Sequence, residues 1–180
     1  YNDLDLFLLD SRSFREVASS NSTLYGDKQI ERLFQEINNN GSTFTIIASP
    51  SPFTFDTHES FLNYKKQFEY FIYRLRVSGT EGVVLVSTGS KEETQMYQYD
   101  LSETKWNGKV KSFYPIYEFN FPPLSDNKFS LIRVEGTSGK RILSFDTYNE
   151  KGNLIYRKRI PHLNMIDDDI FQFWIKNLRL

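Results

Sequence analysis

The sequence contains no cysteine, which excludes disulfides, thiolate catalysis and cysteine-based zinc sites. Histidine is nearly missing as well, because only His58 and His162 occur. They lie far apart in the chain and neither belongs to a pair with ligand spacing, so both are expected to be ordinary surface or half-buried residues. This scarcity leaves little room for metal binding or for acid–base chemistry by imidazole.

The chain also lacks long apolar runs and an excess of either charge. No apolar run reaches the ~18 residues of a membrane-spanning helix, so no membrane span is expected. The net charge of -1 and the isoelectric point near 6.2 give no electrostatic reason to expect a nucleic acid partner. The chain begins with Tyr1 and shows no signal-peptide pattern, so we expect a processed or truncated piece of a longer protein.

Aromatic residues, in contrast, are abundant. The 16 Phe and 11 Tyr contribute to an aromatic share of 16%, which favours a large aromatic core and aromatic sheet surfaces. A chain of 180 residues is long enough to bury such a core and suits one domain or part of a larger one.

The first part of the chain alternates apolar runs with amphipathic segments. The runs Leu4 to Leu9, Phe44 to Ala48 and Val83 to Ser87 predict buried strands. One helix is predicted to begin at Asp27 as its N-cap, and a second to run from about Glu59 to Arg76. Strand, helix, strand, helix, strand is the order typical of a parallel sheet, so we expect the three strands to share one sheet that is buried on both faces. The helix residues expected to face inward are Ile30, Leu33, Phe34, Ile37, Phe61, Phe68, Phe71, Ile72 and Leu75.

After Tyr99 the pattern changes to alternating, β-rich runs separated by turn residues, which predicts an antiparallel β meander. The runs are Tyr114 to Phe121, Phe129 to Glu135, Arg141 to Tyr148 and Leu154 to Ile160. The last residues, Asp167 to Leu180, predict an amphipathic helix with acidic residues at its N-terminus. The expected fold class is α/β (α+β), as one partial domain over 1–180 with parts 1–99, 100–165 and 166–180.

The third predicted strand ends in the turn Ser87-Thr-Gly-Ser-Lys-Glu92. A buried parallel strand delivers such polar groups to a crevice beyond its carboxyl end. This stretch resembles the metal-binding turn of the alkaline phosphatase D (PhoD-like) family, in which a similar strand ends in a Ser-Gly-Asp-x-His motif whose Asp and His hold metal. Neither Asp nor His occurs from Gly82 to Tyr99, so the metal ligands of that motif are missing.

Further segments resemble the C-terminal half of the same family in the correct order, and the likeness covers nearly the whole chain. Each motif is weak alone, but together they make a strong match. They are Leu8-Leu-Asp-Ser-Arg-Ser-Phe-Arg15, Gly26-Asp-Lys-Gln29 with Leu33, Phe44 to Pro52, the helix before Gly82 with the Val83 to Ser87 strand, Tyr114-Pro-Ile-Tyr117 and Ile160-Pro161.

The resemblance implies a calcineurin-like metallophosphatase sandwich of two mixed sheets flanked by helices. It also implies a dinuclear metal centre whose ligands come from both halves of the domain. When the turn is aligned with the family motif from the strand onward without a gap, Gly89 and Lys91 occupy the positions of Asp and His. When it is shifted by one residue so that Thr-Gly matches Ser-Gly, Ser90 and Glu92 occupy them. A lysine ammonium has no lone pair for a metal and a serine hydroxyl is a poor replacement for a carboxylate, so only Glu92 or Glu93 remain as weak ligand candidates. Divalent metals (Ca, Fe, Mn or Zn) are therefore expected only if the longer parent protein is active.

Asp10, Arg12 and Arg15 follow the first predicted strand and are expected at the crevice beyond the carboxyl ends of the sheet. In one interpretation Arg12 holds a phosphate or another anionic ligand with its planar fork. In the other, an Asp10–Arg12 ion pair that can include Arg15 fixes the loop. The second is favoured, since structural ion pairs commonly resemble functional ones. No catalytic residue is assigned.

The leading hypothesis is a non-catalytic, phosphatase-like domain or fragment that acts by scaffolding or partner binding. A half sandwich leaves its first strand and one sheet face uncovered, so either a missing N-terminal half or another protein chain must cover them. The alternatives are part of a metal-dependent phosphoesterase completed by the missing half, and a module that binds phosphate esters without hydrolysis. The family resemblance alone suggests a periplasmic or secreted location.

Overall fold

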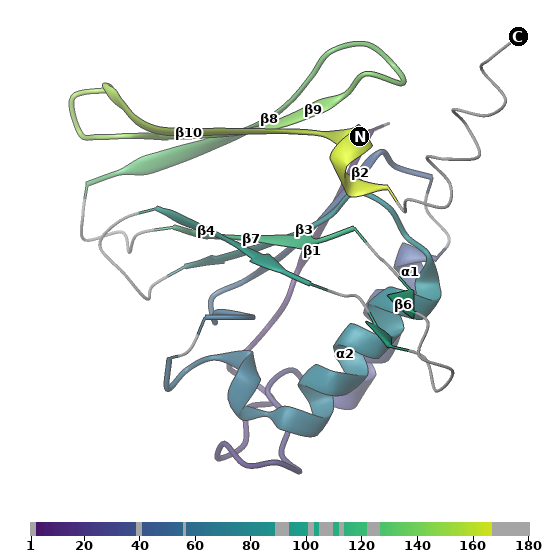
Figure 1. Cartoon of the computed structure of the whole chain (residues 1–180). Coiled ribbons are helices and arrows are strands. Elements are labelled where there is room, and N and C mark those ends of the chain that lie inside the picture. Colours follow the sequence, from purple (N-terminus) through teal and green to yellow (C-terminus); the bar gives the residue numbers. More distant parts are fainter. Residues whose placement is uncertain are drawn as a thin grey trace, which may run out of the picture.

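The computed structural model describes residues 3–38, 41–55, 57–88, 94–100, 103–104, 110–111, 114–121 and 127–166. Figure 1 shows three layers, with a five-stranded sheet in the middle, two helices on one of its faces and a three-stranded sheet on the other. Two short strands, β5 (Glu103–Thr104) and β6 (Val110–Lys111), form a separate antiparallel pair. No helix in the described part of the chain is both long and apolar enough to cross a membrane.

The five-stranded sheet has the order β1-β2-β3-β7-β4. β1 (Leu4–Leu8), β2 (Phe44–Ser49), β3 (Val83–Thr88) and β7 (Ile116–Phe121) run parallel to their neighbours, and β4 (Gln95–Tyr99) pairs antiparallel with β7. The prediction that the first three strands share one sheet is confirmed.

The two helices follow the predicted pattern in their buried faces and differ from it at their ends. α1 (Asp27–Ile37) has Gly26 as its N-cap, so Asp27 is the first helical residue and not the cap. The second helix is divided into a short 3₁₀ turn, η1 (Phe61–Asn63), and α2 (Lys65–Ser78). All the inward-facing residues predicted for the helices are buried.

The prediction of a four-stranded meander is wrong in its first strand. β7 leaves the other three and lies between β3 and β4 in the five-stranded sheet. All residues from Ile116 to Asn120 are buried, because helices cover one face of this sheet and the second sheet covers the other. Period-2 alternation could not reveal this, since two of the buried residues are the polar Glu118 and Asn120. β4 was also not predicted.

The last three strands, β8 (Phe129–Glu135), β9 (Ile142–Tyr148) and β10 (Leu154–Pro161), form the expected antiparallel meander. Their inner face packs on the larger sheet, where the ring of Phe145 stacks on that of Phe119 with centroids 3.5 Å apart. Aromatic stacking of this kind adds to the burial of apolar area that joins the two sheets.

The end of the meander is tied to the amino ends of the parallel strands. After β10 the chain forms a 3₁₀ turn, η3 (His162–Met165), and the carbonyl of Met165 accepts a hydrogen bond from the backbone N–H of Gly82 at 3.1 Å. Gly82 has a φ of 69°, and a Cβ there would lie 2.1 Å from the carbonyl oxygen of Thr43, so only glycine fits. The predicted helix from Asp167 to Leu180 lies outside the described residues.

Of the two expectations for β1, burial on both faces is wrong, whereas a first strand left uncovered by the half sandwich agrees with the described residues. β1 is an edge strand, and Leu6 and Leu8 are 59% and 75% exposed. Their pairing with Ile46 and Ala48 of β2 places them on the side of the three-stranded sheet, which does not cover them. The apolar pattern therefore predicted the strand correctly, but none of the described residues covers Leu6 and Leu8.

Candidate functional site

The crevice predicted beyond the carboxyl ends of the parallel strands is occupied by a buried polar cluster. Ser49 ends β2, Ser87 lies near the end of β3, and Glu118 and Asn120 belong to β7. The pairing register places all four on the helix side of the sheet, where each is 5% exposed or less. Buried polar groups need hydrogen-bond partners, and the contacts of this cluster decide what it can do.

Glu118 is the centre of the cluster because its carboxylate accepts four hydrogen bonds. One oxygen accepts from the backbone N–H of Phe53 at 2.8 Å and from the hydroxyl of Ser87 at 2.6 Å. The other accepts from the backbone N–H of Thr54 at 2.6 Å and from its hydroxyl at 2.5 Å. Asn120 donates from its side-chain amide to the Ser87 hydroxyl at 2.9 Å. Glu118 therefore holds the loop after β2 onto the end of β3.

A second set of hydroxyl contacts fills the same region from the β2 side. The hydroxyl of Tyr25 donates to Ser49 at 2.9 Å, and the hydroxyl of Ser51 donates to that of Ser11 at 3.0 Å. Tyr25, Ser51 and Ser11 are fully buried. Burial raises the pKa of the Tyr25 hydroxyl far above its usual value, so this group stays protonated and acts as a donor.

These contacts occupy both oxygens of Glu118, the carboxylate of the cluster. In the described part of the chain, no group of three acidic or histidine side chains lies close enough together to hold a metal ion. The positions at which the sequence places the degenerate metal turn lie outside the described residues, so the prediction about metal stays a prediction. These positions are Gly89, Ser90, Lys91, Glu92 and Glu93.

The Asp10–Arg12 ion pair considered from the sequence does not form. Asp10 instead accepts the backbone N–H groups of Arg12 at 2.8 Å and Ser13 at 3.0 Å, which fixes the turn after β1. Hydrogen bonds from Ser13, and then from the Arg12 backbone, lower the pKa of Asp10. The carboxylate therefore shapes the loop and is not the partner of the guanidinium groups.

Both guanidinium groups converge on Glu59, a residue that no sequence motif singled out. Arg12 and Arg15 lie 3.2 Å and 3.1 Å from the same oxygen of Glu59, and Arg15 also donates to the hydroxyl of Tyr64 at 3.1 Å. Arg15, and then Arg12, lower the pKa of Glu59. The Arg12 side chain remains 60% exposed. Two guanidinium groups therefore share one carboxylate here.

The two histidines lie apart, as expected. His58 is exposed in a turn, whereas His162 packs edge-on against Phe44 with ring centroids 5.5 Å apart. Burial lowers the pKa of His162, so its imidazole is mostly neutral at pH 7. Neither histidine belongs to a group of described residues that could hold a metal.

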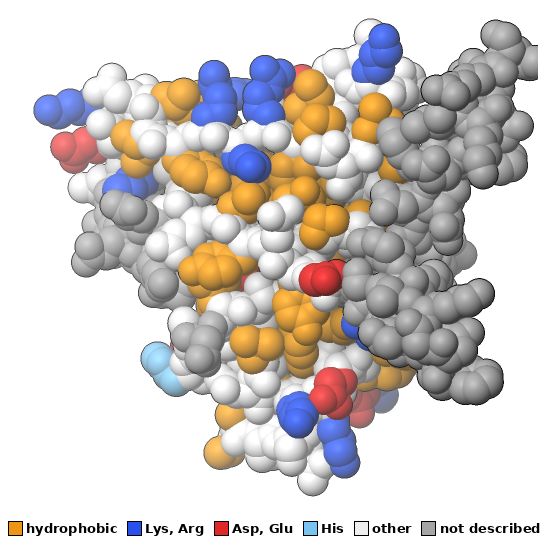
Figure 2. Space-filling model, viewed as in Figure 1, with side chains coloured by type: hydrophobic (Ala, Val, Ile, Leu, Met, Phe, Trp, Pro, Cys, Tyr) orange, Lys and Arg blue, Asp and Glu red, His pale blue; other side chains and the backbone are white. Residues whose placement is uncertain are grey.

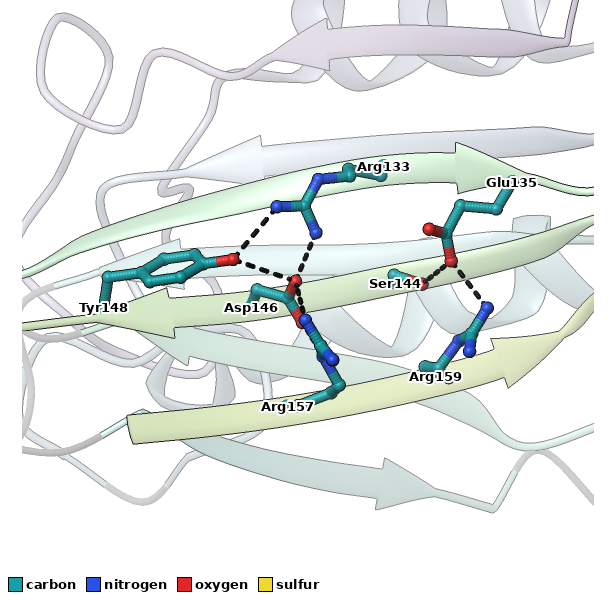
Figure 3. A network of polar contacts seen from close by, with 7 residues as sticks. All are labelled: Arg133, Glu135, Ser144, Asp146, Tyr148, Arg157 and Arg159. Atoms are coloured by element: carbon teal, nitrogen blue, oxygen red, sulfur yellow. Dashed lines mark hydrogen bonds and ion pairs between the residues drawn. The ribbon is translucent and has the colours of Figure 1, made fainter. Parts of the chain in front are cut away.

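A different polar network covers the outer face of the three-stranded sheet (Figure 3). The carboxylate of Asp146 on β9 is fully buried and binds Arg133 of β8 and Arg157 of β10, with Arg157 donating to it at 2.7 and 2.8 Å. Beside it, Glu135 binds Arg159 and the hydroxyl of Ser144. Figure 2 shows Lys and Arg side chains gathered over this sheet. The sequence alone revealed only three alternating strands.

Comparison with known proteins gives a structural match but no match by sequence. No family model matches this sequence, and no curated protein matches it either. A solved structure described as "Structure of PhoD" superposes on the chain with a TM-score of 0.60 and 14% sequence identity. The chain has part of the PhoD fold. The match covers 88% of this chain and 42% of the PhoD chain, so the chain spans less than half of the protein that it resembles. At this identity the likeness to PhoD concerns the fold alone.

Proposed function

We propose that this chain is a non-catalytic part of a PhoD-like domain that acts by binding another protein segment along β1. The observation that carries this proposal is the exposed edge of the five-stranded sheet. Among the described residues no strand pairs with the outer edge of β1, so this edge offers a row of backbone N–H and C=O groups, and Leu6 and Leu8 are exposed beside it. Exposed apolar edge strands pair readily with other chains, and soluble proteins usually protect them.

The proposed lack of catalysis is supported by the sequence of the turn after β3 and by the polar cluster next to it. Two-metal hydrolysis requires ions ~3.5–4 Å apart held by several fixed ligands. The turn lacks the Asp and His of the PhoD-like motif. Glu118, a buried carboxylate on β7 beside β3, already accepts four hydrogen bonds from the protein.

Site-specific crosslinking tests the binding surface. A photoreactive phenylalanine analogue is introduced in the cell at Leu8, or as a matched control at Tyr73, which is 55% exposed on α2. We expect the Leu8 position to give a crosslinked protein that mass spectrometry identifies, and Leu8→Lys to weaken the affinity of that purified protein at least tenfold, since a charge would replace the apolar contact. Equal crosslinking from both positions, or unchanged affinity in the Leu8→Lys variant, contradicts the proposal.

A second candidate function is binding of phosphate esters without hydrolysis, and the arrangement around Glu59 favours it. Arg12 is largely exposed and shares its anion with Arg15. Guanidinium groups bind phosphate in a bidentate manner, and an Arg pair with only one carboxylate has positive charge to spare. The site lies directly after β1, near the surface proposed for the partner.

An assay with phenyl phosphate separates the three functions. We expect no hydrolysis above buffer, with or without added Mn²⁺ or Ca²⁺. If the second candidate holds, calorimetry detects binding that Arg12→Ala weakens at least tenfold, whereas Arg159→Ala, a control of similar exposure, leaves it unchanged. Metal-dependent turnover that Glu92→Gln abolishes would instead establish the enzyme alternative and overturn the non-catalytic proposal.

A further inference from the structure

We infer that the segment that binds β1 is a β-strand carrying a lysine or arginine opposite Asp5, with a bulky apolar residue two positions away on the same face. This inference rests on the proposed function, because it assumes that β1 is the binding edge, and it specifies the chemistry of the partner. Three features of the described residues support it: an unpaired buried oxygen, a recess beside the strand, and the charge of the edge itself.

The unpaired oxygen belongs to Asp5. Its Oδ2 atom is buried and has no hydrogen-bond partner in the described structure. A buried carboxylate oxygen without a donor is costly, and native proteins rarely keep one unless a partner or water supplies the bond. Asp5 pairs with Thr45 of β2, whose side chain is buried, so a further cross-strand neighbour of Asp5 would come from a strand that pairs with the free edge of β1.

The recess lies between β1 and α1, on the same face of the sheet as Asp5. It has a volume of ≈ 630 Å³, and its apolar walls include Phe7, Leu9 and Leu33. Phe14 also lines the recess and is itself 56% exposed, and the charged residues Lys28, Arg32 and Glu36 of α1 line it on the helix side. Phe7 is two residues from Asp5 and therefore lies on the same face of β1. A strand beside β1 that places a donor opposite Asp5 would place its next same-face residue against this recess.

The charge of the edge argues against a second copy of this chain as the occupant. β1 has the sequence Leu-Asp-Leu-Phe-Leu, preceded by Asp3, and contains no basic residue. Pairing two such strands would bring carboxylates near one another, which is unfavourable for directly opposed residues. Arg141 already binds Asp3, so Asp5 is the acidic group on this strand without a partner. A lysine or arginine in the incoming strand would donate a hydrogen bond to the Asp5 carboxylate.

A strand attached to the full chain tests the inference. An N-terminal extension is joined to Asp3 through an Asn-Gly turn, which replaces the first two residues and favours a tight hairpin with β1. Three versions place Lys, Leu or Glu opposite Asp5, and a fourth carries alternating prolines, which cannot pair. Hydrogen exchange of the β1 amides and the melting temperature are measured for each, together with the sedimentation coefficient.

We expect the Lys version to slow exchange of the β1 amides at least tenfold relative to the proline control and to raise the melting temperature most. In the Asp5→Asn background, the Lys and Leu versions should protect the β1 amides equally, because the attraction between the two charges is lost while the shape of residue 5 is kept. In the Lys version, replacing the apolar residue next to the recess by Ala should reduce the protection severalfold.

The outcomes separate this inference from the proposed function. Equal protection by the Lys, Leu and Glu versions would overturn the role of Asp5 while leaving β1 as a binding edge. No protection by any version would overturn the edge as a binding surface, and the proposed function with it. The unextended chain could also form dimers that the Leu8→Lys substitution dissociates. That result would show that a second copy of the chain binds β1, and it would overturn the inference.

Discussion

Replacing Glu118 by Gln is expected to lower the free energy of unfolding by about 3–5 kcal/mol, which is the cost of leaving buried charged or polar groups without their partners. Glutamine has nearly the same shape, but its NH₂ group cannot accept a hydrogen bond. It would therefore face the donors of either Thr54 or Ser87, which now bind a carboxylate oxygen. Urea unfolding followed by fluorescence measures the loss.

The matched control for this variant is Glu31→Gln. Glu31 also accepts hydrogen bonds from two other residues, Arg74 and Tyr70, but its side chain is 47% exposed. Exposed ion pairs contribute little, so its change should be a small fraction of that at Glu118. A Glu118→Gln variant that unfolds at the same urea concentration as the parent would mean that the loop after β2 does not depend on this carboxylate.

The second large effect is expected at Asp146. Asp146→Asn should lower the free energy of unfolding at pH 7 by about 2 kcal/mol, the usual range for hydrogen bonds to a charged group. The Asp146 side chain is fully buried, whereas those of Arg133 and Arg157 are 37% and 51% exposed, so solvent screens part of the interaction. An amide of the same size would keep the packing and lose the charge that holds three strands together (Figure 3).

The pH dependence gives this prediction a second measurement. Hydrogen bonds from Arg157, and then from Arg133, hold the pKa of Asp146 well below its usual range. A carboxyl group with a depressed folded-state pKa stabilises the protein above the unfolded value of ~3.9, and this contribution is lost as the pH falls from there toward the folded value. The difference between the parent and Asp146→Asn should therefore be constant near neutral pH and shrink below about pH 4.

A comparison with Glu135→Gln identifies the cause. Glu135 lies on the same face and binds Arg159, but its side chain is 41% exposed, so we expect a much smaller change at pH 7. If the deficit of Asp146→Asn stays the same from pH 7 to pH 3, the buried charge is not its source, and altered packing of β9 is responsible instead.

The amino-acid sequence by itself determined most of the strands, the buried faces of the two helices and most of the core. The three apolar runs share one sheet, and each predicted inward residue of the helices is buried, because local periodicity encodes which face of an element meets the core. The resemblance to PhoD was visible from short motifs in order, and the superposition agrees at the level of the fold. The lack of Asp and His in the turn after β3 is also a fact of the sequence alone.

The tertiary structure decided the partners of these elements and of their polar groups. β7 alternates like a meander strand, yet it joins the parallel sheet, because strand pairing depends on contacts between residues far apart in the chain. For the same reason, the sequence did not identify Glu59 as the partner of Arg12 and Arg15. Nor did it show that Glu118 and Asp146 are buried residues at the centres of hydrogen-bond networks. Sequence spacing carries no signal for a contact across dozens of residues. Nor could periodicity distinguish a strand buried on both faces from β1, an apolar edge strand that the other described residues leave exposed.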